Sequence, residues 1–347
     1  MNGIRRTVQE LEEYTVPQPQ RMIKLNQNES PFDLPESIKV RILQRLRQIT
    51  WNRYPLSKSP GLVQAISDYT GLKPQYIVCG NGSNELIDSV FQAFCEPGER
   101  VMVVEPGFAI FERQARLRDL NIIKVPLDKG FAYNPDAIID AADSTKLIIL
   151  ASPNNPTGSV LSVEQIKRIL CKTRAFVVID EAYYEFCGVS AQDLLADFGN
   201  LVITRTFSKA FGLAGIRLGY LLAQPEVAKQ LDKAKLPFSV GIFQQVVGEV
   251  VLRMRRYVEQ VVQQIIEERQ RVYNRLCKLK NIQPFASGAN FILFEVKDGQ
   301  ADRLFEMLYQ RGILLRSFNN ISLKNMLRVT IGRPEENSRF LQEMEGI

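Results

Sequence analysis

The sequence predicts an α/β protein, in which a large, mostly parallel sheet is covered by helices and followed by a smaller α+β unit. Three observations predict this fold class. Between about residues 60 and 225, apolar runs alternate with amphipathic segments. The runs are continuously apolar and rich in β-branched residues, as in strands that are buried on both faces. After the proline-bearing stretch "KLPFSVGIF", the alternation gives way to a long helical segment followed by a few strands and helices.

The elements of the large unit follow in order. Apolar runs predict strands over 76–80, 100–107, 121–127, 146–153, 175–183 and 200–208. Amphipathic spacing predicts helices over 83–94, 108–120 and 163–173. Each predicted strand ends in a short segment rich in Gly, Pro, Asn or Ser. Because ligands of open α/β sheets collect at the carboxyl ends of the strands, we expect the functional site there.

The rest of the chain predicts a second unit. A helical stretch is expected to about residue 279, followed by strands in "FILFEV", "ILLRSF" and "LRVTIG", a helix in "ADRLFEMLYQRG" and a closing helix. We therefore divide the chain into a large unit over 36–240 and a small unit over 241–347. The irregular segment 1–35 is expected to pack on the small unit or on a partner subunit.

Composition favours an ordinary globular enzyme. The 347 residues are 45% apolar, with a mean hydropathy of -0.11. No apolar run approaches the roughly 18 residues that span a bilayer, and the N-terminus lacks the apolar core of a secretory signal. We therefore expect a cytoplasmic protein that binds no membrane. The formal charge of +6 is diffuse, which disfavours nucleic acid as a partner and suits phosphate or carboxylate substrates.

Cysteine and histidine usage restricts the chemistry. The five cysteines show no CxxC spacing, so we expect free thiols rather than disulfides or metal ligands. The chain contains no histidine, which excludes serine–histidine and cysteine–histidine triads and most zinc sites. We expect no metal. In an enzyme working near neutral pH, another group must therefore move protons.

Polar residues gather at four predicted strand ends. Lys209 follows a strand on a hydroxyl-rich turn, with Thr206, Ser208 and Arg217 nearby as good phosphate ligands. Asp180 emerges from "VVID", either as a turn or capping residue or as a carboxylate in a partly dry site. "ASPNNPTG" (151–158) forms a rigid turn that can direct amides into the same cleft.

The fourth strand end is "CGNGSNELI" (79–87), a glycine turn that opens a helix. Its backbone N–H groups can cradle a phosphate, although simple capping by Ser83 or Asn84 explains the same residues. It is neither a GxGxxG fingerprint nor a Walker A loop, so nucleotide binding by those routes is disfavoured. A phosphate cradle, amides, a carboxylate and a lysine together suit one small molecule, the phosphorylated pyridine aldehyde pyridoxal 5'-phosphate.

The motifs "NGSNE", "PNNPTG", "DEAYYEF" and "TRTFSKAFGLAGIRLGY", in this order, resemble those of the fold type I pyridoxal-phosphate aminotransferases. The resemblance covers essentially the whole chain and implies a seven-stranded, mostly parallel sheet in the large domain. Within the family, "LNQNESPF", "RYP" and the late pair "ILLRSF" and "LRVTIG" resemble the histidinol-phosphate aminotransferase branch.

The resemblance implies a role for each matching residue. Lys209 would bond the cofactor aldehyde and then act as the base that moves the substrate proton. Asp180 would pair with the ring nitrogen, and Asn155 and Tyr183 would hydrogen-bond the phenolic oxygen. Phe108 matches the ring-stacking aromatic; many relatives carry tyrosine there, so stacking is kept and a hydroxyl is lost.

The same likeness places the cofactor phosphate on the turn of Gly82, Ser83 and Asn84, together with Thr206, Ser208 and Arg217. Tyr54 matches a tyrosine that relatives lend to the phosphate in the neighbouring subunit, which implies a homodimer with shared sites. The alternative is a core tyrosine before a proline turn.

Substrate binding is implied for four residues. Arg328 corresponds to the arginine that grips a carboxylate in general aminotransferases, and in the histidinol-phosphate branch it helps bind phosphate. Arg316 would supply a second cation, since two guanidiniums suit a dianion better than one. Either arginine could instead be a surface residue. Asn28 and Tyr14 are candidate contacts from the N-terminal segment.

The expected reaction is a ping-pong transfer of an amino group between L-histidinol phosphate and 2-oxoglutarate. An aminotransferase for aromatic amino acids would use the same catalytic residues, but its substrate gives Arg316 no anion to bind. A decarboxylase of phosphorylated threonine shares the fold and the need for a phosphate site. A cofactor-sensing regulator would need an attached DNA-binding domain, for which too few residues precede the sheet.

Overall fold

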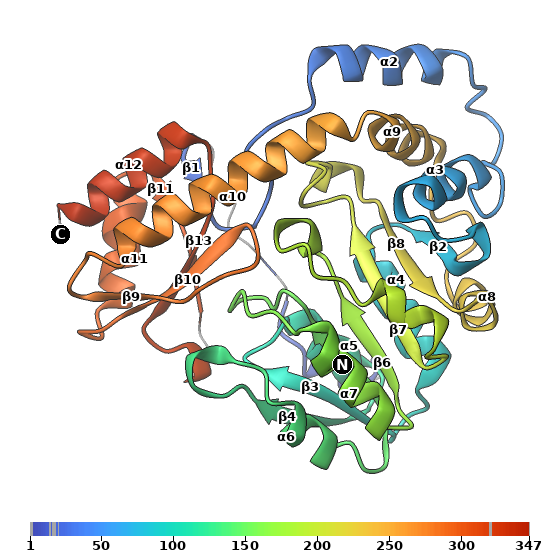
Figure 1. Cartoon of the computed structure of the whole chain (residues 1–347), viewed down its shortest axis with the longest axis horizontal. Coiled ribbons are helices and arrows are strands. Elements are labelled where there is room, and N and C mark those ends of the chain that lie inside the picture. The colour runs from blue at the N-terminus through green and yellow to red at the C-terminus, as the bar shows by residue number, and fades with distance from the viewer. Residues whose placement is uncertain (1–2, 14, 16–18, 20, 319–320, 347) are drawn as a thin grey trace.

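The computed structural model describes residues 3–13, 15, 19, 21–318 and 321–346. At its centre is a seven-stranded sheet in the order β2-β8-β7-β6-β5-β3-β4 (Figure 1). The strands are β2 (Ile77–Gly80), β3 (Arg100–Glu105), β4 (Asn121–Pro126), β5 (Thr145–Ala151), β6 (Phe176–Asp180), β7 (Leu201–Thr206) and β8 (Gly219–Ala223). Only β8, among these seven, runs against its neighbours. The predicted mostly parallel sheet with a smaller α+β unit is confirmed.

Helices cover both faces of this sheet. They are α3 (Pro60–Thr70), α4 (Ser83–Phe94), α5 (Ala109–Leu117), α6 (Pro135–Asp140), α7 (Val163–Lys172) and α8 (Pro225–Ala234). In β6, Val178 joins an apolar cluster with α4, α5 and α8. Its neighbours Val177 and Ile179 join a second cluster, which includes α3, α6 and α7. Consecutive strand residues point to opposite faces, so burial on both faces explains the continuous apolar runs.

The small unit has a four-stranded antiparallel sheet in the order β12-β13-β10-β9. Its strands are β9 (Ile282–Pro284), β10 (Phe291–Val296), β12 (Arg316–Ser317) and β13 (Met326–Thr330). The helices that follow the sheet of the large unit are α9 (Ile242–Arg253), α10 (Arg256–Leu276), α11 (Ala301–Gln310) and α12 (Pro334–Glu345). Short 3-10 turns are η1 (Pro74–Tyr76), η2 (Lys129–Phe131), η3 (Tyr184–Phe186), η4 (Gln192–Ala196), η5 (Ala214–Ile216) and η6 (Ile321–Leu323).

The expected single helical stretch to about residue 279 is two helices. Helix α9 is buried along most of its length, from Val246 to Leu252, and packs against α2 (Glu36–Arg47) and α3. Helix α10 buries one apolar stripe and leaves a charged face exposed. The two helices bury different surfaces, and the chain breaks between them at Met254, where φ is -108° and ψ 24°. The division at residue 240 stays a prediction, and α9 beyond it packs on helices of the large unit.

The N-terminal segment contains α1 (Arg6–Gln9) and β1 (Ile23–Lys24). Strand β1 pairs in parallel with β11 (Ile313–Leu314), and the backbone N–H of Thr330 donates to the carbonyl of Leu25 at 2.9 Å. The residues that follow β1 are therefore attached to the edge of the small unit. They continue as a strap, residues 25–29, toward the carboxyl ends of the large sheet.

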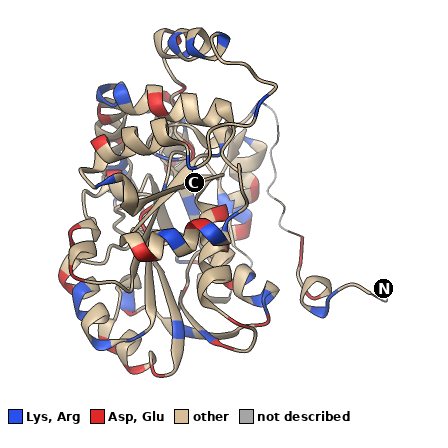
Figure 2. Ribbon diagram, turned by 90° about the vertical axis from the view of Figure 1, so that its right-hand side faces the viewer, with Lys and Arg blue, Asp and Glu red and all other residues tan. Residues whose placement is uncertain are grey.

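Charged residues of both signs are interspersed along the helices (Figure 2). Within the described part of the chain, no helix is both long and apolar enough to span a membrane.

Candidate active site

Lys209 lies just beyond the end of β7, where its side chain is partly buried. Its Nζ donates a hydrogen bond to the carbonyl of Gln27 at 3.0 Å and lies 5.8 Å from the ring centre of Tyr183. Burial disfavours the charged ammonium, and the nearby cations Arg328 and Arg217 oppose it further. Together they lower the pKa of Lys209 to about 8. The amine therefore loses its proton far more readily than a solvated lysine does.

Asp180 occupies the last position of β6 and is almost fully buried. Its Oδ1 accepts a hydrogen bond from the hydroxyl of Thr204 at 2.8 Å. Burial raises the pKa of Asp180 to about 6, while Thr204, the backbone N–H of Ala182 and the charge of Lys209 act in the opposite direction. At neutral pH the carboxyl is mostly ionised. A buried anion of this kind suits a cationic ligand.

The residues predicted to hold a phosphate meet at the start of α4. Gly82 has a φ of +80°, and a Cβ there would lie 2.7 Å from Nη2 of Arg217. Arg217 donates from Nη1 to Oγ of Ser208 at 3.3 Å, and the N–H of Ser208 donates to Oγ1 of Thr206 at 3.1 Å. The site thus combines a guanidinium, two hydroxyls and the N-terminus of a 12-residue helix. The absence of a side chain at Gly82 leaves room for the guanidinium of Arg217 beside this helix start. This donor set fits a phosphate.

The N-terminal strap binds the site through its main chain. Three consecutive main-chain carbonyls of the strap each accept a hydrogen bond from a side chain. The carbonyl of Asn26 accepts from Nη2 of Arg328 at 2.8 Å, and the carbonyl of Gln27 accepts from Lys209. The carbonyl of Asn28 accepts from Nδ2 of Asn290 at 3.1 Å. The side chain of Asn28 donates to the hydroxyl of Tyr183 at 2.9 Å. Arg328 also donates from Nη1 to Oδ1 of Asn155. These contacts bring Lys209, Tyr183, Asn155 and Arg328 together around the strap.

A family model described as aminotransferase class I and II matches residues 20–344. The chain belongs to this family. The histidinol-phosphate aminotransferase of Thermococcus kodakarensis is 40% identical over 342 residues, which cover 99% of this chain and 97% of that protein. The enzyme of the same name from Chlorobium phaeovibrioides is 39% identical over 332 residues, which cover 94% and 92%. The predicted resemblance to fold type I aminotransferases, and to this branch of them, is confirmed.

A solved structure agrees with the fold. The histidinol-phosphate aminotransferase from Sinorhizobium meliloti, in complex with pyridoxal-5'-phosphate, has a TM-score of 0.90 and covers 100% of this chain and 98% of that chain. Its sequence identity is 23%, so this likeness shows the fold alone.

The structure also places the remaining residues predicted from the aminotransferase resemblance. Asn84 is exposed in the first turn of α4, and Phe108 precedes α5, with its ring edge-on to Phe111 at 5.4 Å. Tyr54 is 82% exposed and stacks on Phe238 at 4.9 Å, which is not the core position considered from sequence. Arg316 in β12 lies directly across from Arg328 in β13. Tyr14 lies outside the described residues.

Several polar residues of this aminotransferase site were not predicted. Thr204 binds Asp180, and Asn290 and Thr330 hold Asn28. Each is a buried polar residue within, or directly before, an apolar strand. Such a residue needs a hydrogen-bond partner, so its presence in "LVITRT" or "NFILFEV" was a usable signal. The sequence pattern could not identify the partner, because each partner comes from a distant segment.

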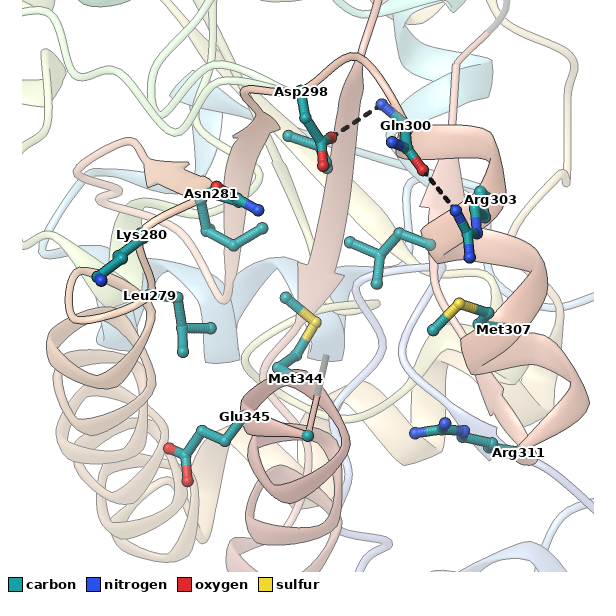
Figure 3. A pocket seen from close by; sticks show the side chains of 14 residues that line it. Leu279, Lys280, Asn281, Asp298, Gln300, Arg303, Met307, Arg311, Met344 and Glu345 are labelled. Atoms are coloured by element: carbon teal, nitrogen blue, oxygen red, sulfur yellow. Dashed lines mark hydrogen bonds between the residues drawn. The ribbon is translucent and has the colours of Figure 1, made fainter.

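A cavity of about 650 Å³ lies elsewhere in the molecule, between the end of α10, the sheet of the small unit, α11 and α12 (Figure 3). Leu279, Met307 and Met344 line it together with cations and anions, among them Arg303 and Glu345. None of the described residues predicted for the active site lines this cavity. It is therefore separate from the chemistry at the strand ends.

Proposed function

We propose that this aminotransferase transfers an amino group between L-histidinol phosphate and 2-oxoglutarate, with pyridoxal 5'-phosphate as cofactor, by a ping-pong mechanism. Class membership already implies small-molecule amines and oxo acids as substrates. The observation that carries the choice of amine is the pair Arg316 and Arg328, which face each other across β12 and β13. Side chains of directly opposite strand residues lie on the same face, so two guanidiniums can meet one phosphate.

The cofactor residues act as a set. Gly82, Ser83, Asn84, Thr206, Ser208 and Arg217 would hold the phosphate. Asn155 and Tyr183 would hold the phenolic oxygen, and Phe108 would stack on the ring. When bound, the cofactor supplies an electron-poor ring that makes a carbon-bound proton of the amine acidic. Asp180 would stabilise the positive ring nitrogen as its counter-ion.

Lys209 has two tasks in this proposal. Its amine would bond the cofactor aldehyde and, once the substrate amine has displaced it, would act as the base that takes the proton from the amine-bearing carbon of the substrate. A pKa of about 8 suits both tasks, because an appreciable fraction of the amine is unprotonated near neutral pH. The chain has no histidine that could act instead.

Substrate binding would involve the arginine pair and the strap. Arg328 would bind the phosphate of histidinol phosphate and, in the second half-reaction, a carboxylate of 2-oxoglutarate. Arg316 would add the second positive charge that a phosphate dianion requires. Asn28 and Tyr14 are candidate contacts from the N-terminal segment.

A homodimer would complete the site. Trp51 and Tyr54 are exposed before α3, and they contact Phe243 and Phe238, which belong to the segment around the start of α9. Leu56 and Leu236 are also exposed in these two segments. An apolar patch of this kind commonly marks a protein interface. The second copy would cover it and receive Tyr54 in its phosphate site.

We also propose a cytoplasmic location.

The test is the absorption spectrum of the cofactor-loaded protein before and after L-histidinol phosphate is added without any acceptor. We expect the band of the lysine-bound cofactor to fall and that of the aminated cofactor to rise at modest substrate concentration. Lys209→Ala is the control and should not form the first band. If the band forms but does not respond, the substrate is wrong, and aromatic amino acids and phosphothreonine should be tried next. If wild-type protein forms no band, the cofactor assignment falls.

A further inference from the structure

Thr204 is placed beside Asp180 by the sheet itself. The two residues are register partners in the parallel strands β6 and β7. Thr204 has no exposed surface, and Asp180 is 4% exposed. The hydroxyl of Thr204 donates to Oδ1 of Asp180 at 2.8 Å. Because both backbones are held in the centre of the sheet, this hydrogen bond fixes the orientation of the carboxylate.

The residues that follow Asp180 and Thr204 in the chain form a second pair, which is an ion pair. Glu181 and Arg205 form a buried ion pair at 2.8 Å, and Glu181 also accepts from the N–H of Ala191 at 2.7 Å. Consecutive residues of extended strands point to opposite faces. Two neighbouring carboxylates therefore differ in their partners: Glu181 is neutralised by a cation, whereas Asp180 receives a neutral hydroxyl. A neutral donor orients the anion and leaves its charge available to a cationic ligand.

The other charged or titratable groups around Asp180 are few. The negative charge of Glu181 disfavours the ionised form, and the positive charge of Lys209 favours it. Tyr133 is buried nearby and donates its hydroxyl to the carbonyl of Ala151. Burial, and secondarily the negative charge of Asp180, raises the pKa of this phenol. Apart from the N–H of Ala182, the Thr204 hydroxyl is the hydrogen-bond donor that stabilises the carboxylate.

We propose that Thr204 is a positioning residue, whose hydroxyl fixes the orientation and the charge of the Asp180 carboxylate that would pair with the cofactor's ring nitrogen. The inference rests on the proposed function for the identity of that ring. The interaction itself belongs to the protein chain, so it can be tested without cofactor or substrate.

The first test is a pH titration of aspartate carboxyl carbons by NMR in the cofactor-free protein. The Asp180 signal is identified by its loss in Asp180→Asn. We expect Thr204→Val, which removes the hydroxyl and keeps the shape, to raise the Asp180 midpoint by about one pH unit. Thr204→Ser should keep the wild-type midpoint. Thr145→Val, the same change at a buried threonine at the start of β5, should leave it unchanged.

The second test uses the loaded protein. Thr204→Val should raise the dissociation constant of pyridoxal 5'-phosphate about tenfold and lower kcat, while KM for both substrates changes by less than about twofold. An unchanged Asp180 midpoint in Thr204→Val overturns the proposal. A midpoint in Thr204→Ser that is raised as much as in Thr204→Val overturns it as well. If the valine variant does not fold, Thr204→Ala replaces it with the same expected shift. If neither folds, Thr204 is structural and the proposal falls. The titration stays valid if the substrate assignment fails.

Discussion

Burial in the folded protein disfavours the charged forms of the two residues that carry the proposed chemistry, Asp180 and Lys209. Asp180 is an acid whose pKa is raised to about 6, and Lys209 is a base whose pKa is lowered to about 8, in both cases chiefly by burial. A perturbed pKa of this kind is common at functional sites, because the same low-polarity surroundings that destabilise a charge strengthen its interaction with a ligand.

Asp180→Asn should therefore stabilise the cofactor-free protein. The raised pKa means that ionisation of Asp180 opposes folding, fully above about pH 6 and not at all below the unfolded value of 3.8. We expect a gain of roughly 2 kcal/mol at pH 8 that declines through pH 6 and disappears near pH 4. Urea unfolding of both proteins at several pH values measures it. A variant that is no more stable than wild type at pH 8 contradicts the prediction.

Arg316 supplies a test of substrate choice. Arg316→Gln keeps hydrogen-bonding capacity but removes one of the two facing positive charges, so it should raise KM for L-histidinol phosphate about 10- to 100-fold. The change in KM for 2-oxoglutarate should be smaller, because Arg328 remains for its carboxylate. Arg303→Gln, an exposed arginine of α11, is the matched control. Equal losses for both substrates would show that Arg316 does not distinguish phosphate.

At the scale of elements, the sequence pattern predicted six of the seven strands of the large sheet, because each is a local apolar run, and it missed β8. A run such as 176–180 is apolar throughout, and its polar residue comes at the end. The break at Met254 was missed because α9 and α10 both have apolar residues at helical spacing. The strap was missed as a structural unit because its hydrogen bonds are made by main-chain carbonyls, which carry no sequence signal.

The strap predicts a coupling between its anchor and the site. Oγ1 of Thr330 accepts from the N–H of Asn28 at 2.9 Å and donates to Oδ1 of Asn28 at 3.1 Å. Thr330→Val leaves the buried N–H of Asn28 without this acceptor, so we expect a loss of about 1–3 kcal/mol in the free energy of unfolding. KM for the amine substrate should also rise, since Asn28 binds Tyr183.

Thr330→Ser provides the control for this element, because it keeps the hydroxyl. It should retain most of the stability and the wild-type KM. If the free energy of unfolding falls as much in Thr330→Ser as in Thr330→Val, packing of the threonine methyl group explains the effect, rather than the hydrogen bonds to the strap.

At the scale of the whole molecule, the chain leaves an apolar patch exposed beside α3 and α9. Tyr54 at 82% and Trp51 at 63% exposure are large aromatic residues whose rings contact Phe238 and Phe243 of the same patch. Because these side chains remain largely exposed, they bury little apolar surface and contribute little to the free energy of unfolding of a single chain. Their position is explained if a second copy covers them, and the dimer then determines whether each phosphate site is complete.

Mixed dimers test this arrangement. Tyr54→Phe keeps the ring but removes the hydroxyl, and we expect it to lower cofactor affinity about tenfold, as for the loss of one charge-assisted hydrogen bond. Lys209→Ala should be inactive. When the two variants are mixed, unfolded and refolded together at limiting cofactor, heterodimers should regain one intact site, formed by Lys209 of one subunit and Tyr54 of the other. Activity then rises above that of either variant alone. If Tyr54 serves its own subunit, no heterodimer contains an intact site, and mixing restores nothing.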